Sequence, residues 1–194
     1  MDFLLQCAKS YENLLNYKYH FVIARKGVCR EFSIIFQKSD FHHLAGLHKL
    51  TDKRSLQHGS REVLFNSILQ SKYDMNYLQS SFHFDEMKDR LFALDNLEKL
   101  LDSENLVFKY NENVRVSSSI KSDYLIEGEV NSQTLFLFLA SREKSLENEQ
   151  ICRSFFPKSN IDYSIGQPSY TLLKKEKIRI DNSTVVFTYE RKYN

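Results

Sequence analysis

Six β-rich segments follow one another in the second half of the chain and constrain its fold more than any other feature. They are rich in Val, Ile, Phe, Tyr and Thr and are bounded by Asn, Ser, Gly and Pro, which predicts short strands joined by turns. One of them contains the apolar run 135–140 without alternation, which is typical of a strand covered on both faces. The segments are Leu106–Tyr110, Tyr124–Val130, Thr134–Arg142, Ile151–Phe156, Tyr170–Ile180 and Thr184–Arg191.

The first half of the chain instead carries apolar residues mostly at helical spacing. The predicted helices are 2–15, 39–50, 61–71 and 84–101. Between the first two, a period of two over 17–36 flanks Lys26-Gly27 and predicts a β-hairpin. We therefore expect one α+β domain over 1–194, in which N-terminal helices and a β-hairpin pack on a C-terminal antiparallel sheet. Its helix-rich part is 1–104 and its β-rich part is 105–194.

Charge is unevenly distributed along the chain, although the formal net charge is only +2. The charge balance is +4 over 1–83, −6 over 84–150 and +4 over 151–194, and all six histidines lie in the first of these segments. An anionic ligand is therefore expected to meet the two ends of the chain and to avoid its middle. We expect the acidic helix over 84–103 to be structural, with its carboxylates directed away from a functional site.

Cysteine usage and the distribution of apolar residues indicate the compartment. Cys7, Cys29 and Cys152 are an odd number without close spacing, so neither a disulfide framework nor a cysteine zinc site is expected. The N-terminus lacks the basic start of a signal peptide and carries Asp2. The apolar run 135–140 is far shorter than the ~20 residues that span a bilayer. We therefore expect a cytoplasmic protein without a membrane partner.

One of the predicted helices carries three histidines and a lysine and holds the most chemical information. With about 100° per residue, His43 and His48 fall on its apolar side or at the edge of that side, whereas His42, Gly46 and Lys49 fall opposite. Three interpretations are open: core histidines bonded to backbone carbonyls, a metal site, and acid–base chemistry. The i, i+5 spacing differs from the i, i+4 pair that a helix offers to zinc. A glycine inside a helix favours close approach by another backbone or a ligand.

This helix reads FHHLAGLHKL and follows the turn Arg25-Lys26-Gly27 and the strand EFSIIF. It resembles the pattern F-x-H-L-x-G-L-x-K-L of phage- and mobile-element-borne nucleases of the Barnase–EndoU–colicin–RelE-like group. The later stretch TLLKKE resembles a strand with two lysines in that group, and the resemblance extends discontinuously over most of the chain. It implies a helical N-terminal part on an antiparallel sheet and RNA cleavage without a metal ion. The motif positions are His43, Leu44, Gly46, Leu47, Lys49 and Leu50.

Metal-independent cleavage of RNA needs several groups around the scissile phosphate. A base takes the proton of the 2′-OH, an acid protonates the leaving 5′-oxygen, and cations stabilise the charge on the phosphate. His43 is the first candidate for the acid or the base, and His48 is its closest rival. Lys49 completes the candidate catalytic set. Arg142, directly after the apolar run 135–140, is either a phosphate ligand or a solvated charge at a strand end. No metal ion and no cofactor are expected.

The predicted strand 170–180 carries a second cationic pattern. Lys175, Lys177 and Arg179 alternate onto one face, and Lys174 lies on the other. Cations at every second residue match a phosphodiester backbone, so Lys174, Lys175 and Lys177 are candidate RNA-binding residues. The alternative is an edge strand that lysines protect from aggregation.

Two classes of function follow from these patterns. The first is a metal-independent endoribonuclease that acts on RNA as a toxin-like, phage or mobile-element effector, with an inhibitor or host protein as a further partner. The second is a non-catalytic phage or mobile-element protein that binds a protein partner or nucleic acid. Clustering of His43 with Arg142 and a lysine in one pocket favours the first class. A buried His43 that is bonded to a backbone carbonyl and has no cation nearby favours the second.

Overall fold

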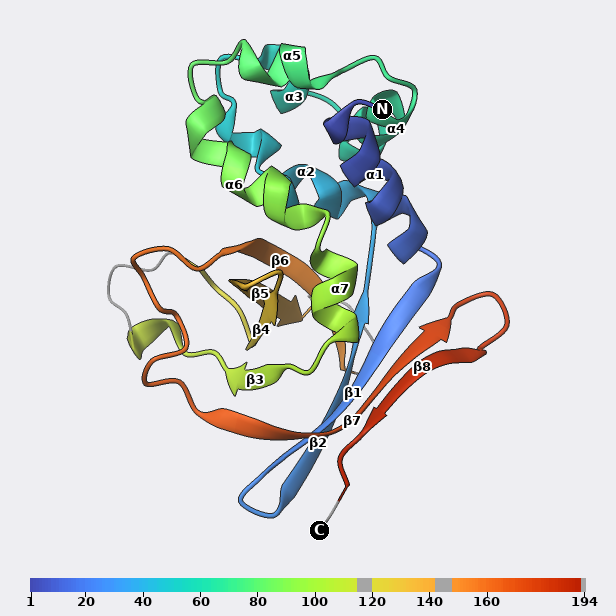
Figure 1. Ribbon diagram of the computed structural model, residues 1–194, viewed down its shortest axis with the longest axis vertical. Coiled ribbons are helices and arrows are strands. Elements are labelled where there is room, and N and C mark those ends of the chain that lie inside the picture. The colour runs from blue at the N-terminus through green and yellow to red at the C-terminus, as the bar shows by residue number, and fades with distance from the viewer. Residues whose placement is uncertain (115–119, 142–147, 193–194) are drawn as a thin grey trace.

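The computed structural model describes residues 1–114, 120–141 and 148–192, which form a helical part and a β-barrel (Figure 1). The helical part lies at one end of the barrel. One cluster of buried hydrophobic residues runs through both parts, from Leu4 in the first helix to Leu172 in a late strand. No helix among these residues is long and apolar enough to cross a membrane.

Seven strands close into a ring. In order around the barrel they are β1 (Tyr17–Arg25), β2 (Val28–Ile35), β6 (Glu149–Pro157), β5 (Gln133–Ser141), β4 (Tyr124–Val130), β3 (Leu106–Lys109) and β7 (Ser169–Arg179). The pairing of β7 with β1 closes the ring. Neighbouring strands are antiparallel except β2 and β6, which are parallel. An eighth strand, β8 (Val185–Glu190), pairs with β7 and lies outside the ring.

The mixture of helices and strands agrees with the predicted α+β class, but the predicted layout is wrong. The β1–β2 hairpin does not pack on a separate antiparallel sheet, because its strands are part of the barrel wall. β1 pairs with β7 from Tyr17 opposite Arg179 to Ala24 opposite Thr171, and β2 pairs with β6. This closure gives hydrogen-bond partners to edges that a separate hairpin and an open sheet would leave unpaired.

The central strand β5 is buried on both faces, as its uninterrupted apolar run predicts. Leu135, Leu137 and Leu139 belong to the main core, and all three are 0% exposed. Phe136 and Phe138 alternate with them and belong to a second, smaller cluster, also with 0% exposure. The prediction of a strand covered on both faces is therefore confirmed.

Most of the helical elements lie in the part of the chain between β2 and β3, whereas the first precedes β1 and the last follows β3. The helical elements are α1 (Phe3–Leu14), α2 (Phe41–Leu44), α3 (Arg54–Gln57), α4 (Arg61–Leu69), α5 (Met75–Gln79), α6 (Phe84–Leu94), α7 (Leu97–Asp102) and the 3₁₀ helices η1 (Lys38–Asp40), η2 (Leu47–Lys49) and η3 (Glu112–Val114). The carboxylate of Asp2 caps α1 by accepting from the backbone N–H groups of Leu4 (3.0 Å) and Leu5 (3.3 Å). The helix predicted over 84–101 is divided into α6 and α7 by a turn at 95–96.

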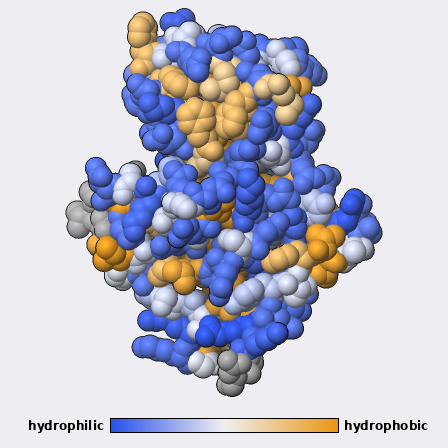
Figure 2. Space-filling view, viewed as in Figure 1, coloured by the Kyte–Doolittle hydropathy of each residue, from blue (hydrophilic) through white to orange (hydrophobic). Residues whose placement is uncertain are grey.

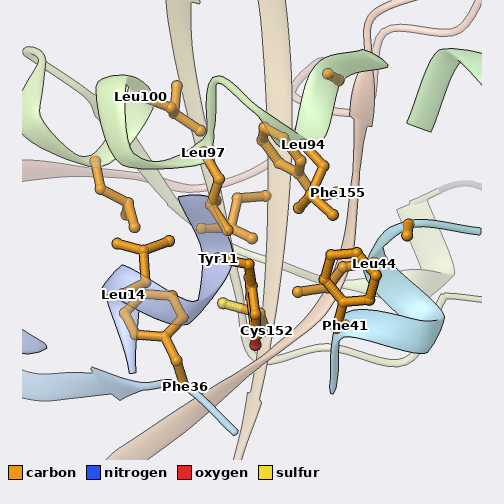
Figure 3. Close-up of a cluster of buried hydrophobic side chains, with 14 of the residues drawn as sticks. Tyr11, Leu14, Phe36, Phe41, Leu44, Leu94, Leu97, Leu100, Cys152 and Phe155 are labelled. Atoms are coloured by element: carbon orange, nitrogen blue, oxygen red, sulfur yellow. The ribbon is translucent and has the colours of Figure 1, made fainter. Parts of the chain in front are cut away.

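Aromatic side chains join the helical part to the barrel (Figure 3). The ring centroid of Tyr11 in α1 lies 5.5 Å from that of Phe41, 5.9 Å from that of Phe65 and 6.2 Å from that of Phe36. The hydroxyl of Tyr11 donates to the backbone carbonyl of Gln37 (3.0 Å), so its polar end is satisfied inside the core. These contacts fix α2, which begins at Phe41, against α1 and over β6.

Candidate active site

A left-handed glycine interrupts the helix that the sequence predicts over 39–50. Gly46 has a φ of +78°, so α2 ends at Leu44 and the chain continues as η2. Glycine adopts this conformation without the steric cost that a Cβ brings. A Cβ on Gly46 would lie 3.1 Å from Cδ of Arg90 and 3.1 Å from Cβ of Met87. The close approach expected at Gly46 is therefore made by α6.

This interruption reverses the predicted orientation of two neighbouring histidines. The helical wheel places His42 toward water and His43 toward the core, but His42 is 4% exposed and His43 is open to solvent. Once Leu47 and Leu50 no longer belong to the helix, the other apolar residues of the segment define its buried side. His43 falls nearly opposite that side. The outward direction predicted for His42 is therefore wrong, and His43, predicted at the edge of the apolar side and directed inward or into a crevice, faces solvent beside His48.

His42 has the structural role that a buried histidine often has. Its Nε2 lies 2.8 Å from the backbone carbonyl of Leu56, and Arg61 also donates to that carbonyl (2.9 Å). Burial, followed by the charge of Arg61, lowers the pKa of His42 to about 4. The neutral imidazole therefore ties α2 to the loop that carries α3.

His43 and His48 form a stacked histidine pair across the Gly46 turn. Their ring centroids are 4.1 Å apart, and their planes differ by 18°. Partial burial, followed by the positive charges of Arg90 and Arg153, lowers the pKa of His43. Burial, followed by the charges of His43 and Arg90, lowers the pKa of His48 to about 3. Both imidazoles are therefore mainly neutral at pH 7 and able to accept a proton.

Two arginines from distant parts of the chain border the histidine pair. Arg90 comes from α6, and its guanidinium carbon lies 4.7 Å from the ring centroid of Phe156. Arg153 comes from β6 and is exposed. Sequence reasoning identified neither arginine, because no spacing links them to His43. Packing of α2 and η2 against α6 and β6 brings the three residues together.

Two buried polar atoms at this site lack a hydrogen-bond partner in the part of the chain that the structure describes. They are Nη1 of Arg90 and Nδ1 of His48. A buried group left in this way costs ~1–3 kcal/mol, so both atoms favour a water molecule or a ligand. A guanidinium N–H donates well to the oxygens of a phosphate, and a neutral imidazole nitrogen accepts a proton. The guanidinium donor is therefore suited to a phosphate oxygen, and the imidazole nitrogen to a group that donates a hydrogen bond.

The η2 segment that carries His48 is held by a side chain of α3. The side-chain amide of Gln57 donates to the backbone carbonyls of Leu47 (2.9 Å) and Leu50 (3.0 Å), on either side of His48 in the sequence. The half-buried Lys49 follows His48, and its positive charge contributes to the low pKa of that histidine. The structure thus brings all three predicted catalytic residues to one turn.

A comparison with models of protein families identifies the family of this chain. A family model described as phage-Barnase-EndoU-ColicinE5/D-RelE like nuclease4 matches residues 4–192, nearly the whole chain. The chain belongs to this nuclease family. The match spans α2, η2, α6 and β6, which carry the histidine pair and both arginines, and it confirms the resemblance that FHHLAGLHKL indicates. Comparisons with curated proteins and with solved structures give no significant match.

The fold buries one of the predicted RNA-binding lysines completely. Lys175 is 0% exposed, and its ammonium donates to the backbone carbonyl of Ser103 and to Oδ1 of Asn105 (2.7 Å). Burial lowers its pKa to about 8. Lys175 is therefore a structural contact between β7 and the segment after α7, and we no longer assign it to RNA.

Lys177 also forms contacts inside the protein. Its ammonium forms ion pairs with Glu98 (2.5 Å) and Asp102 (3.2 Å) of α7, and the residue is 6% exposed. Asp102 also accepts from the hydroxyl of Tyr19 in β1 (2.6 Å). The cationic face of the strand is thus covered by α7, whose carboxylates are engaged there. This arrangement agrees with the structural role expected for the acidic helix and removes Lys177 from the candidate RNA contacts.

The remaining predicted substrate-binding residues do not extend the site. Lys174 forms an ion pair with Glu176 on the same strand (2.9 Å). Arg142 lies outside the described residues. Within 1–114, 120–141 and 148–192, no group of three or more His, Cys, Asp or Glu side chains is placed to hold a metal ion.

Proposed function

We propose that this nuclease is a metal-independent endoribonuclease in which the 2′-OH of RNA attacks the adjacent phosphate. The observation that carries the proposal is the stacked pair of His43 and His48, bordered by Arg90 and Arg153. A neutral, solvent-accessible imidazole can take a proton, and guanidinium groups can hold a phosphate and stabilise its developing charge. Both requirements of metal-independent cleavage therefore meet in one site of a chain whose family is a nuclease family.

In the proposed reaction, His43 accepts the proton of the 2′-OH while that oxygen forms a bond to phosphorus. The bond from phosphorus to the 5′-oxygen breaks, and this oxygen takes a proton from the ammonium of Lys49. Arg90 and Arg153 bind the non-bridging phosphate oxygens. His48 orients the His43 ring by stacking and adds little charge of its own. The products are a 2′,3′-cyclic phosphate and a 5′-hydroxyl.

The decisive experiment is incubation of the purified protein with a defined RNA oligonucleotide in EDTA. We expect cleavage to persist and to leave 2′,3′-cyclic phosphate and 5′-hydroxyl ends. His43→Ala removes the proton acceptor and should slow cleavage by about 10²–10⁴-fold. His58→Ala is the matched control, because His58 is an exposed histidine outside the histidine pair, and it should cleave at the wild-type rate.

A single 2′-deoxy substitution at the cleaved position separates this mechanism from attack by water. It removes the proposed nucleophile, so cleavage at that position should stop while neighbouring positions remain sensitive. Cleavage that needs Mg²⁺, or that continues with His43→Ala at full rate, would contradict the proposal. A protein that binds RNA or a protein partner and cleaves no RNA would favour the alternative, a non-catalytic phage or mobile-element protein.

An enzyme of this kind would act where cellular RNA is found. We therefore extend the proposal to a cytoplasmic, toxin-like effector of a phage or mobile element, with RNA as substrate and an inhibitor or host protein as a further partner. The family description carries the link to phage and to nuclease activity. Induced expression should then arrest growth for the wild-type chain and spare growth for His43→Ala.

A further inference from the structure

The turn between α5 and α6 holds an aromatic side chain in solvent. Phe82 is 95% exposed, the highest value among the exposed large hydrophobic residues that the structure describes. Apolar atoms are also visible at the surface of the helical part, among largely polar neighbours (Figure 2). Full burial of a Phe side chain is worth roughly 1.5–3 kcal/mol, so a ligand that covers Phe82 gains this contact.

The turn that carries Phe82 is fixed by hydrogen bonds. The carboxylate of Asp52 accepts from the hydroxyl of Ser81 (2.5 Å) and from the backbone N–H of Phe82 (3.3 Å). The ammonium of Lys53 donates to the hydroxyl of Ser80 (2.7 Å). An aromatic ring on a turn held in this way binds a ligand with little further loss of backbone freedom.

Charges of both signs flank this turn: Asp85 and Glu86 follow Phe82 in α6, whereas the segment 49–61, which holds the turn by hydrogen bonds and follows His48 in the chain, is cationic. The segment 49–61 contains four Lys or Arg residues and one acidic residue, Asp52. Arg54 in this segment is exposed, and the ammonium of Lys53 lies 5.0 Å from the ring centroid of Tyr77. The four residue-to-residue steps from His48 to Asp52 span at most ~14 Å. A flexible polyanion bound at the histidine pair can therefore reach the turn.

We propose that Phe82 stacks on an unpaired base of single-stranded RNA whose scissile phosphate lies at the histidine pair. Lys53 and Arg54 contact the RNA phosphates between the stacked base and the scissile phosphate. The inference takes its substrate from the proposed function and adds a preference for single strands, because base faces inside an RNA duplex are not free to stack. A protein partner would need a wider apolar surface than one ring whose neighbours in the turn are Ser81 and His83.

The test measures binding of a fluorescent ten-nucleotide single-stranded RNA to the full chain with His43→Ala, in which slowed cleavage leaves the RNA intact during the measurement. A duplex of the same sequence is measured in parallel. Phe82→Ala and Phe82→Leu should each weaken single-strand binding by about tenfold, and Phe82→Trp should retain it, because a stacking base needs an aromatic face. Duplex binding should change by less than twofold in all three variants.

Two further variants serve as controls. Phe92→Ala removes another exposed aromatic of the helical part, 47% exposed, and should leave both affinities unchanged. Arg54→Gln should reduce the slope of log affinity against log salt by about one, as expected for one lost phosphate contact. Melting temperatures of all variants exclude loss of folding as the cause of weaker binding.

Unchanged single-strand affinity with Phe82→Ala, full retention by Phe82→Leu, an equal loss for the duplex, or no RNA binding at all would each overturn the inference. Unchanged single-strand affinity with Phe82→Ala would instead favour a protein partner as the ligand of the exposed ring. Because binding is measured without cleavage, the two proposals fail separately. A wild-type chain that binds single strands through Phe82 but cleaves none contradicts only the proposed reaction. Cleavage that does not depend on Phe82 contradicts only the stacking.

Discussion

The pKa of His43 is lowered first by partial burial and then by two guanidinium groups. A carboxylate neighbour would favour the imidazolium, whereas Arg90 and Arg153 disfavour it and add to the effect of partial burial. The same cations that lower its affinity for a proton would bind the phosphate of a substrate. Once the phosphate is bound, its negative charge offsets theirs and lets the imidazole accept the proton.

The pH dependence of cleavage should follow this arrangement. The proposed base is active when deprotonated, so kcat/KM is expected to rise with pH, with a midpoint below 6.5, and to level off above it. Arg153→Gln removes a positive charge, so it should raise that midpoint while lowering the plateau. Initial rates on one oligonucleotide between pH 4.5 and 8 measure both effects. A rate that falls across this range would assign the acid role to His43 instead.

At the scale of elements, Gly46 couples the histidine pair to α6. Gly46→Ala should lower the free energy of unfolding by about 2–3 kcal/mol, because Ala is strained at φ +78° and its Cβ meets Arg90 and Met87 at 3.1 Å. Gly27→Ala is the matched control, because Gly27 has φ +77° and no atom within 4 Å of an added Cβ. It should lose only about 1 kcal/mol. Equal losses in denaturant titrations would show that the contact with α6 contributes nothing.

Sequence patterns within one segment correctly predicted the helices and strands whose formation depends on residues of that same segment. The β-rich run over 124–130 became β4, the uninterrupted apolar run became the centre of β5, and the amphipathic pattern over 2–15 became α1. In each case the side chains that set the pattern also make the contacts, so sequence spacing is sufficient. The single helix predicted for His43, His48 and Lys49 is instead divided into α2 and η2 by Gly46.

The remaining features depend on contacts between distant residues. The register that joins β1 to β7 cannot be read from either strand alone, so the barrel was missed. Lys175 and Lys177 alternate as an exposed cationic face would, but the contacts that bury them come from the segment 98–105. No pattern near Arg90 or Arg153 in the sequence predicts their place in the site. They lie near His43 only because α6 and β6 pack against α2.

At the scale of the whole molecule, the helical part and the barrel share one hydrophobic core. We therefore expect one cooperative unfolding transition, with the same midpoint for helical circular dichroism and for tyrosine fluorescence. This measurement also tests the predicted single domain over 1–194. A helical part that melts before the barrel would show that the aromatic contacts around Tyr11 do not couple the two parts.

The ring of strands also sets the order in which the chain can be completed during translation. Residues 17–24 of β1 pair with residues 171–179 of β7. During synthesis β1 therefore cannot complete its pairing until β7, one of the last segments, has left the ribosome. Arg153 on β6 is likewise made long after the histidine pair. For an enzyme with the proposed activity, late assembly has a protective effect. The nascent chain lacks its finished site for most of the time that it is held beside ribosomal RNA.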